Sequence, residues 1–233
     1  MANKVLLDIS EAKPSFDENH LPPVAFNLQV KPGDCVIIEA RDLEAATAFA
    51  NLCSGMVSLR EGAVLFKGLD WFALKEPRLS ALRGCIGRVF QKGGWLDMYS
   101  VAVNILSPSL HHTMIDEDKL IDQALSLCHK FGLPGLPMDT PREATTIDLA
   151  RAACVRALMN TPDLLLLEYP AEGYSADLMS PLLEMLNFAQ NRGGGIICFT
   201  RQLDLWNDYK ERVTHWMRLQ EKGLTSVRLV SNV

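Results

Sequence analysis

The chain has 233 residues, of which 48% are hydrophobic and 22% charged, ordinary values for a globular domain. Its 28 acidic and 23 basic residues give a formal charge of −5, without the basic footprint that general nucleic-acid or anionic-membrane binding needs. No apolar run approaches the roughly 18 residues of a membrane-spanning helix, and the first residues do not form a secretory signal. The six cysteines lack a Cys-x-x-Cys motif, which predicts buried, reduced thiols rather than a disulfide scaffold.

Strand-like and helix-like segments alternate along the chain, which predicts an α/β fold. In the first part we expect strands at 26–30, 35–38 and 63–66 and a helix at 44–53. Amphipathic helices follow at 116–131 and 143–159, the second preceded by a capping box of Thr140 and Glu143. Strands at 164–167 and 196–199, a helix at 181–190 and a hairpin within 212–230 complete the pattern. Continuous apolar strands between helices favour a parallel sheet covered on both faces.

The order of these landmarks is more informative than any one of them. A strand-turn-strand and helix at 26–54 precede Val89-Phe90-Gln91, and a helix at 151–158 precedes the strand at 164–170 and Phe199-Thr200-Arg201. In this order the chain resembles the nucleotide-binding domain of ABC transporters over nearly its whole length. The stretch 87–98, Gly-Arg-Val-Phe-Gln-Lys-Gly-Gly-Trp-Leu-Asp-Met, is most similar to the ATPase subunit of MCE-type lipid transporters.

The resemblance implies one ABC nucleotide-binding-like domain over 1–233. Its core is expected to be of the P-loop NTPase type: a mixed sheet flanked by helices, with an N-terminal antiparallel β part. A helical subdomain is expected at 92–150, inserted in that core.

The segment at the place of the phosphate loop (Walker A) departs from the family's pattern. Instead of Gly-x-x-x-x-Gly-Lys-[Ser/Thr], whose amides and lysine bind phosphates, the chain has Ala40-Arg41-Asp42-Leu43-Glu44-Ala45-Ala46-Thr47. Both glycines and the lysine are alanine, so backbone freedom and the main positive charge are lost and only Thr47 matches. Asp42 and Glu44 add negative charge that repels phosphate, offset in part by Arg41.

The other motifs of the family are altered as well. Glu168 and Tyr169 stand where Walker B has Asp and Glu, and a tyrosine with a pKa of about 10 cannot replace a water-orienting carboxylate. Arg201 takes the place of the switch histidine and keeps a fixed charge. The signature Leu-Ser-Gly-Gly, whose helix N-terminus faces the partner's γ-phosphate, is replaced by a bulkier, more acidic run: Ala144-Thr145-Thr146-Ile147, followed by Asp148.

Two expectations concern the surroundings of these motifs. The capping box at Thr140 suggests that the signature helix starts early and engages its amides internally, which an Ala144 outside any helix would refute. In the family, a residue at the position of Gln91 contacts magnesium and water, and the stretch after it docks the permease. For the side chains there we leave core packing and partner contact as equal alternatives: Trp95, Leu96, Met98 and Tyr99.

ABC domains work as head-to-tail dimers in which each ATP site joins one chain's phosphate loop to the other chain's signature. Because this chain is altered in both, no such pairing that includes it restores a complete site. We therefore expect a pseudo-ATPase with no cofactor and no metal site. Its role would be structural or regulatory, at the cytoplasmic face of a membrane transport complex such as an MCE-type lipid transporter. Its partners would be a permease and a second ABC-type chain, as a homodimer or heterodimer.

Two alternatives stay open. A divergent nucleotidase would bind ATP and magnesium with Thr47, Gln91 and Glu168. A soluble regulator would have no role in transport.

Overall fold

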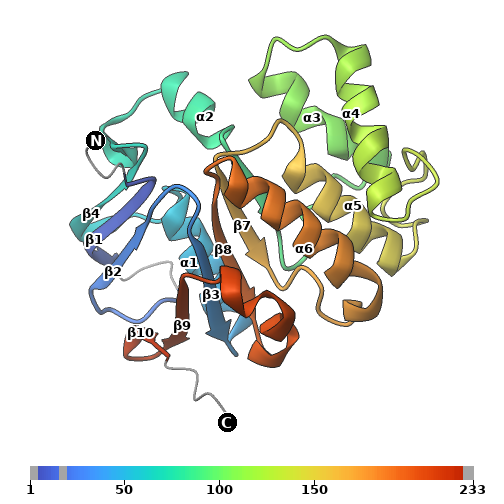
Figure 1. The fold of residues 1–233 in the computed structure, drawn as a ribbon. Helices are drawn as coiled ribbons and strands as arrows, with labels where there is room; N and C mark the ends of the chain where they lie inside the picture. The colour runs from blue at the N-terminus through green and yellow to red at the C-terminus, as the bar shows by residue number, and fades with distance from the viewer. Residues whose placement is uncertain (1–4, 16–19, 228–233) are drawn as a thin grey trace.

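The computed structural model describes residues 5–15 and 20–227, which form two β-sheets and a set of helices (Figure 1). In these residues the larger sheet has six strands in the order β10-β9-β3-β8-β7-β6. Its strands are β3 (Cys35–Ala40), β6 (Ile86–Val89), β7 (Leu164–Glu168), β8 (Gly195–Thr200), β9 (His215–Gln220) and β10 (Gly223–Ser226). All neighbours pair in parallel except β9 and β10. The predicted α/β fold with a mixed sheet is confirmed.

The smaller sheet is antiparallel and has the order β2-β1-β4-β5. Its strands are β1 (Leu7–Pro14), β2 (Phe26–Val30), β4 (Leu59–Phe66) and β5 (Leu69–Asp70). The strand expected at 63–66 is the second half of β4. The sequence pattern did not predict β1 as a separate strand, because its register shifts between Ile9 and Ala12 and interrupts the alternation.

Helices connect the strands and cover the larger sheet. They are α1 (Leu43–Cys53), α2 (Arg78–Arg83), α3 (Val101–His112), α4 (Glu117–Lys130), α5 (Thr146–Leu158) and α6 (Ser175–Asn191), with 3₁₀ segments η1 (Trp71–Ala73) and η2 (Leu203–Arg212). Helices α3, α4 and α5 lie between β6 and β7 in the chain and gather at the end of the molecule opposite the antiparallel sheet (Figure 1). None of the helices in the described residues is long and apolar enough to span a bilayer.

Most predicted helices and strands are present, with some corrected boundaries. The expected helix at 116–131 is α4, which begins after the capping Asp116. The helix expected at 181–190 begins earlier, at Ser175, because Pro181 lies inside α6 and does not start it. In the region expected to form a hairpin, β9 and β10 pair over 215–226, whereas 212 ends a 3₁₀ segment and 228–230 lie outside the described residues.

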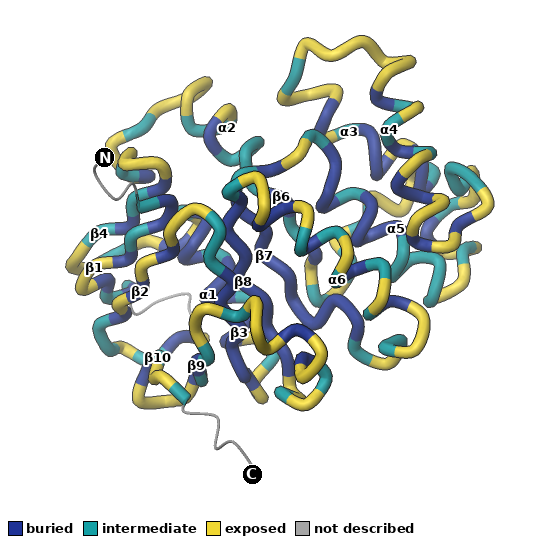
Figure 2. Tube along the Cα trace, in the orientation of Figure 1, coloured by how far each residue is buried: buried dark blue, intermediate teal, exposed yellow. Residues whose placement is uncertain are grey.

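Buried side chains form two layers, one on either side of the larger sheet, and the central strands of this sheet are the buried middle of the molecule in Figure 2. Along the central strands, alternate side chains enter opposite layers: Val36 and Ile38 of β3 pack toward α1 and the antiparallel sheet, whereas Cys35 and Ile37 pack toward α3 to α6. Strands buried on both faces are apolar at nearly every position, which explains the continuous runs seen in the sequence. The cysteines are free thiols, and all are buried except the half-buried Cys85.

Candidate functional site

The connection between β3 and α1 is too short to wrap around phosphates. Strand β3 ends at Ala40 and α1 begins at Leu43, so only Arg41 and Asp42 lie outside regular structure. The Asp42 carboxylate accepts hydrogen bonds from the backbone N–H groups of Glu44 (2.9 Å) and Ala45 (3.1 Å). It therefore caps α1 and occupies the amides that a helix N-terminus offers to an anion.

A cleft of about 690 Å³ opens beside this connection. Its polar lining includes Glu39, Asp42 and Glu221 with Arg41 and Arg218. Glu39 and Arg218 neutralise each other through a hydrogen bond of 2.6 Å from Nε to Oε2 and an ion pair through Nη2. Arg41 then shares the cleft lining with the two further carboxylates of Asp42 and Glu221, so the local charge does not favour a triphosphate.

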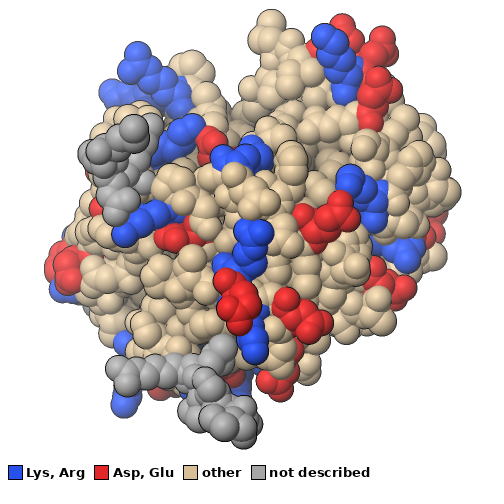
Figure 3. All heavy atoms as spheres, in the orientation of Figure 1, with Lys and Arg blue, Asp and Glu red and all other residues tan. Residues whose placement is uncertain are grey.

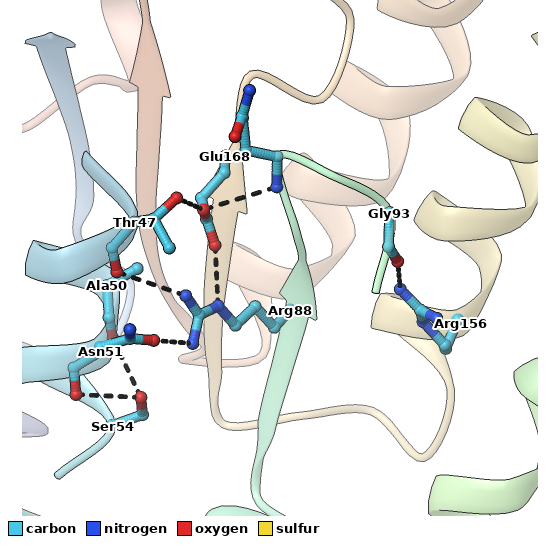
Figure 4. Close-up of polar contacts among 9 residues, drawn as sticks. Thr47, Ala50, Asn51, Ser54, Arg88, Gly93, Arg156 and Glu168 are labelled. Carbon is cyan, nitrogen blue, oxygen red and sulfur yellow. Dashed lines mark hydrogen bonds and ion pairs between the residues drawn. The ribbon is translucent and has the colours of Figure 1, made fainter. Parts of the chain in front are cut away.

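An internal cation occupies the neighbourhood of the Walker B position (Figure 4). Arg88 of β6 donates from Nε to Oε1 of Glu168 at 2.8 Å and from Nη1 to Asn51 Oδ1 at 2.7 Å. Thr47 of α1 donates its hydroxyl to Oε2 of Glu168 at 2.5 Å, and the backbone N–H of Gln91 points to the same oxygen at 3.4 Å. The ion pair is buried, because the exposed fractions of the Arg88 and Glu168 side chains are 8% and 0%.

These contacts test whether magnesium fits the site. Thr47 and Glu168 carry oxygen atoms of the kind magnesium prefers. However, both carboxylate oxygens of Glu168 already accept hydrogen bonds, one of them from a guanidinium, and the Thr47 hydroxyl donates to the carboxylate. Within residues 5–15 and 20–227 there is also no group of three or more His, Cys, Asp or Glu that could hold a metal ion. The arrangement does not fit a divalent cation, since a fixed guanidinium charge stands against the carboxylate.

The sequence reasoning missed Arg88 and Asn51 as members of this site. In β6, Gly87 and Val89 face the helical layer of the core. Arg88 stands between them in the strand, so its side chain points to the opposite face, toward α1. A charged residue inside a short buried strand requires a partner of opposite charge. This signal was available in the sequence, but the identity of the partner depends on how β6, β7 and α1 are placed together.

Tyr169 is held against the β3–α1 connection. Its hydroxyl donates to the carbonyl of Ala40 at 3.0 Å, and its backbone N–H donates to the carbonyl of Phe199 at 3.1 Å. The residue has a φ of 51°, a left-handed conformation that is uncommon outside glycine. Burial raises the pKa of the Tyr169 phenol, so it stays protonated at neutral pH and serves as a hydrogen-bond donor.

The residue at the switch position makes a local ion pair. Arg201 donates from Nε to Glu172 Oε1 at 2.6 Å, and Glu172 belongs to the turn that follows β7. Glu44, in the first turn of α1, pairs instead with His20 at 3.1 Å. Neither side chain joins the contacts around Glu168 that are described above.

The prediction that the signature helix starts early is wrong. Ala144 lies outside any helix, and α5 begins at Thr146 with Thr145 as its N-cap. Only half of the expected capping box forms: Glu143 Oε2 accepts from the Thr140 N–H at 3.0 Å, but the Glu143 N–H donates to the Thr140 carbonyl instead of the hydroxyl, and the segment is an isolated turn. The N-cap follows at Thr145, whose Oγ1 accepts from the Asp148 N–H at 3.2 Å and donates to the Asp148 carboxylate at 2.7 Å. The helix starts after this cap, where the apolar stripe begins.

The four side chains after Gln91 lie in different surroundings. Trp95 is half-buried and packs against the helical core layer, whereas three large apolar side chains are exposed. Their exposed fractions are 55% for Leu96, 82% for Met98 and 48% for Tyr99. His111 and His112 at the end of α3 are exposed, and the two rings contact each other.

Comparison with known proteins identifies relatives of the chain. No protein-family model matches it. It is 30% identical over 168 residues to the intermembrane phospholipid transport system ATP-binding protein MlaF of Haemophilus influenzae, covering 71% of this chain and 64% of that protein. It is 27% identical over 212 residues to the lipoprotein-releasing system ATP-binding protein LolD 1 of Rhodopirellula baltica, covering 89% and 91%. The dimeric ABC transporter cassette MJ0796 superposes with a TM-score of 0.79 and 17% identity, over 97% of this chain and 99% of that one.

The superposition shows that the chain has the fold of an ABC-type ATP-binding cassette. The chain is a homologue of ABC transporter ATP-binding subunits, and its relatives include the phospholipid-transport protein MlaF. The expected resemblance is confirmed at this level. The chain spans just under two thirds of the length of the Haemophilus MlaF protein, at 64%.

Proposed function

We propose that the chain is a pseudo-ATPase, an ABC-type subunit that holds the cytoplasmic side of a membrane transport complex without binding or hydrolysing ATP. The observation that carries this proposal is the buried ion pair of Arg88 and Glu168. It supplies an internal positive charge at the Walker B carboxylate, where the family's resemblance would place magnesium.

The free-energy cost of admitting Mg-ATP supports this role. Magnesium would have to displace the Arg88 guanidinium from a carboxylate with no exposed surface, and breaking such a buried pair costs about 3–5 kcal/mol. The phosphates would have to displace Asp42 from the amides of α1 and lie beside its charge. A lysine that could offset these costs is missing, since Ala46 stands at its position.

The part proposed to bind the partner is residues 93–99, called here the docking loop. Three large apolar side chains of this loop are exposed: Leu96, Met98 and Tyr99. On the adjoining helix α3, Val103 and Leu110 are also exposed and lie seven residues apart, on one face of the helix. Such a surface fits an apolar segment of a permease, and MlaF and LolD are by name subunits of phospholipid and lipoprotein systems. The chain would then lie at the inner face of the membrane, alone or paired with a second ABC-type chain.

Two measurements test the proposal. Calorimetric titration of the full chain with ATP and magnesium is expected to give no binding heat, with the Haemophilus MlaF protein as a positive control. A tagged chain purified from its source cells in mild detergent is expected to carry a permease, in equal amounts with and without Mg-ATP. Micromolar ATP binding would overturn the pseudo-ATPase role, and failure to recover a permease would favour a soluble regulator.

A divergent nucleotidase is the second candidate, because Thr47, Glu168 and the Gln91 N–H do converge. In that case Arg88 would leave Glu168 when ATP and magnesium bind. Measurable ATP turnover that Thr47→Ala abolishes would establish this candidate in place of the pseudo-ATPase.

A further inference from the structure

Arg156 of α5 holds the backbone of the docking loop. Its Nη1 donates to the carbonyl of Gly94 at 2.9 Å, and its Nη2 donates to the carbonyl of Gly93 (Figure 4). The guanidinium also lies over the Trp95 ring, 4.2 Å from the centroid, and 5.6 Å from the centroid of Phe90. One side chain from the signature helix thus fixes two carbonyls and two rings of the segment that follows β6.

The two glycines have the backbone that this contact requires. Gly93 and Gly94 have φ angles of 77° and 57°. A Cβ atom at Gly93 would lie 2.4 Å from Trp95 Nε1, and one at Gly94 would lie 2.9 Å from the Phe90 ring. Glycine is therefore needed at both positions for the carbonyls to face Arg156 while the rings pack close.

The other end of the docking loop is fixed by Asn104 of α3. This residue is buried, and its side-chain amide accepts from the Leu96 N–H at 2.8 Å and donates to the Leu96 carbonyl at 3.2 Å. The same amide nitrogen donates to the Ser100 carbonyl at 3.0 Å. Buried polar groups are stable only when they are hydrogen-bonded, and Asn104 makes these bonds to the backbone of the loop. The contacts therefore fix the conformation of the loop.

The docking loop is linked to the buried ion pair as well. Two guanidinium groups contact the Phe90 ring, that of Arg88 at 4.5 Å and that of Arg156 at 5.6 Å from its centroid. Arg88 is held by Glu168, which also accepts from the Gln91 N–H. The chain of contacts therefore runs from the Walker B position through Phe90 to the loop, and it is made entirely of side chains and backbone of this protein.

We propose that Arg156 and Asn104 are positioning residues that keep the docking loop permanently in its partner-binding conformation, with no nucleotide required. The loop has a fixed backbone and exposed apolar side chains, so the entropy cost of ordering it is met before the partner binds. The partner is an apolar segment of the permease, and in this respect the inference rests on the proposed function.

Hydrogen exchange on the full chain tests the positioning role. Arg156→Gln is expected to raise the exchange of backbone amides at 95–99 by about tenfold or more, since bonds from a charged donor are lost, and Arg156→Lys is expected to restore part of the protection. Arg142→Gln is the matched control. Arg142 pairs with Asp97 of the same loop at 3.1 Å, but the side chains are 78% and 52% exposed, so this substitution is expected to leave exchange nearly unchanged. Equal exchange in Arg156→Gln and wild type would overturn the inference, as would an equal rise in the Arg142→Gln control.

Two further arms separate this inference from the proposed function. Mg-ATP is expected to leave exchange at 95–99 unchanged in the wild type, and a change would contradict the pseudo-ATPase role whatever Arg156 does. With the permease recovered by co-purification as the probe, Arg156→Gln and Asn104→Ala are expected to weaken its binding about tenfold while Arg142→Gln is neutral. If both variants loosen the loop but bind the permease as the wild type does, the loop is not the docking site and the inference fails.

Discussion

The buried ion pair of Arg88 and Glu168 makes the sharpest prediction about this molecule. Arg88→Met keeps the hydrocarbon stem but removes the charge, leaving the Glu168 carboxylate with no exposed surface and only the Thr47 hydroxyl and the Gln91 N–H as partners. Removing one member of a buried pair costs about 3–5 kcal/mol. For a domain of this size, that lowers the melting temperature by about 6–20 °C.

The prediction becomes specific when Arg88→Met is made in a protein that already carries Glu168→Gln. The glutamine is uncharged, so no buried charge is left alone, and Arg88→Met is then expected to cost about 1 kcal/mol or less. The double-mutant cycle should therefore give a coupling free energy of about 2 kcal/mol or more.

Urea denaturation of the four proteins at pH 7, in low and high salt, measures these free energies of unfolding. The coupling should persist in high salt because buried charges are little screened. Lys130 and Glu184 form a matched surface pair at 2.7 Å, with side chains 44% and 65% exposed, and their cycle should give less than about 1 kcal/mol. The reasoning is refuted if Arg88→Met lowers the free energy of unfolding by the same amount in the wild type and in the Glu168→Gln variant.

Further predictions concern the helix cap, the tyrosine and the thiols. Asp42→Ala should cost about 1 kcal/mol of stability while Asp42→Asn is nearly neutral, since asparagine caps equally well; equal losses would show that the charge matters instead. Tyr169→Phe should cost about 1 kcal/mol through the lost bond to the Ala40 carbonyl, and an unchanged urea midpoint would contradict this. Burial raises the pKa of Cys53 from 9.0 to about 12, so the folded state keeps this proton more tightly than the unfolded state. The contribution of this thiol to the free energy of unfolding should therefore be fully present below about pH 9 and be lost as the pH rises toward 12. Over this range, Cys53→Ala should lower by one the number of protons released on unfolding, which makes the pH dependence less steep. Cys85, the half-buried thiol, should react first with a thiol reagent in the native protein, and faster labelling of another cysteine would contradict the burial.

The charge distribution agrees with the composition. On the face drawn in Figure 3, lysine and arginine side chains are interspersed with aspartate and glutamate rather than gathered by sign. A surface of this kind gives no general attraction to a polyanion.

Local sequence patterns predicted the elements where the deciding interactions are local. The turn 31–34 and the apolar strands at 164–167 and 196–199 are specified by the residues within each short segment, and they were predicted correctly. The start of α5 was not, because two threonines with an acidic residue three positions later follow each other, at Thr140 and Thr145, and the helix is capped by the second.

The sequence alone predicted an ABC-type α/β chain, with residues 40–47 at the place of the family's phosphate loop. It showed alanine at positions 40, 45 and 46, where the family's pattern has two glycines and a lysine. Only the tertiary structure decided which side chains meet around Glu168. Arg88, Thr47 and Glu168 come from three separate elements, so their meeting depends on the relative placement of β6, α1 and β7. Burial then gives the ion pair its strength, because charges removed from water interact strongly only with the partners that the fold brings to them.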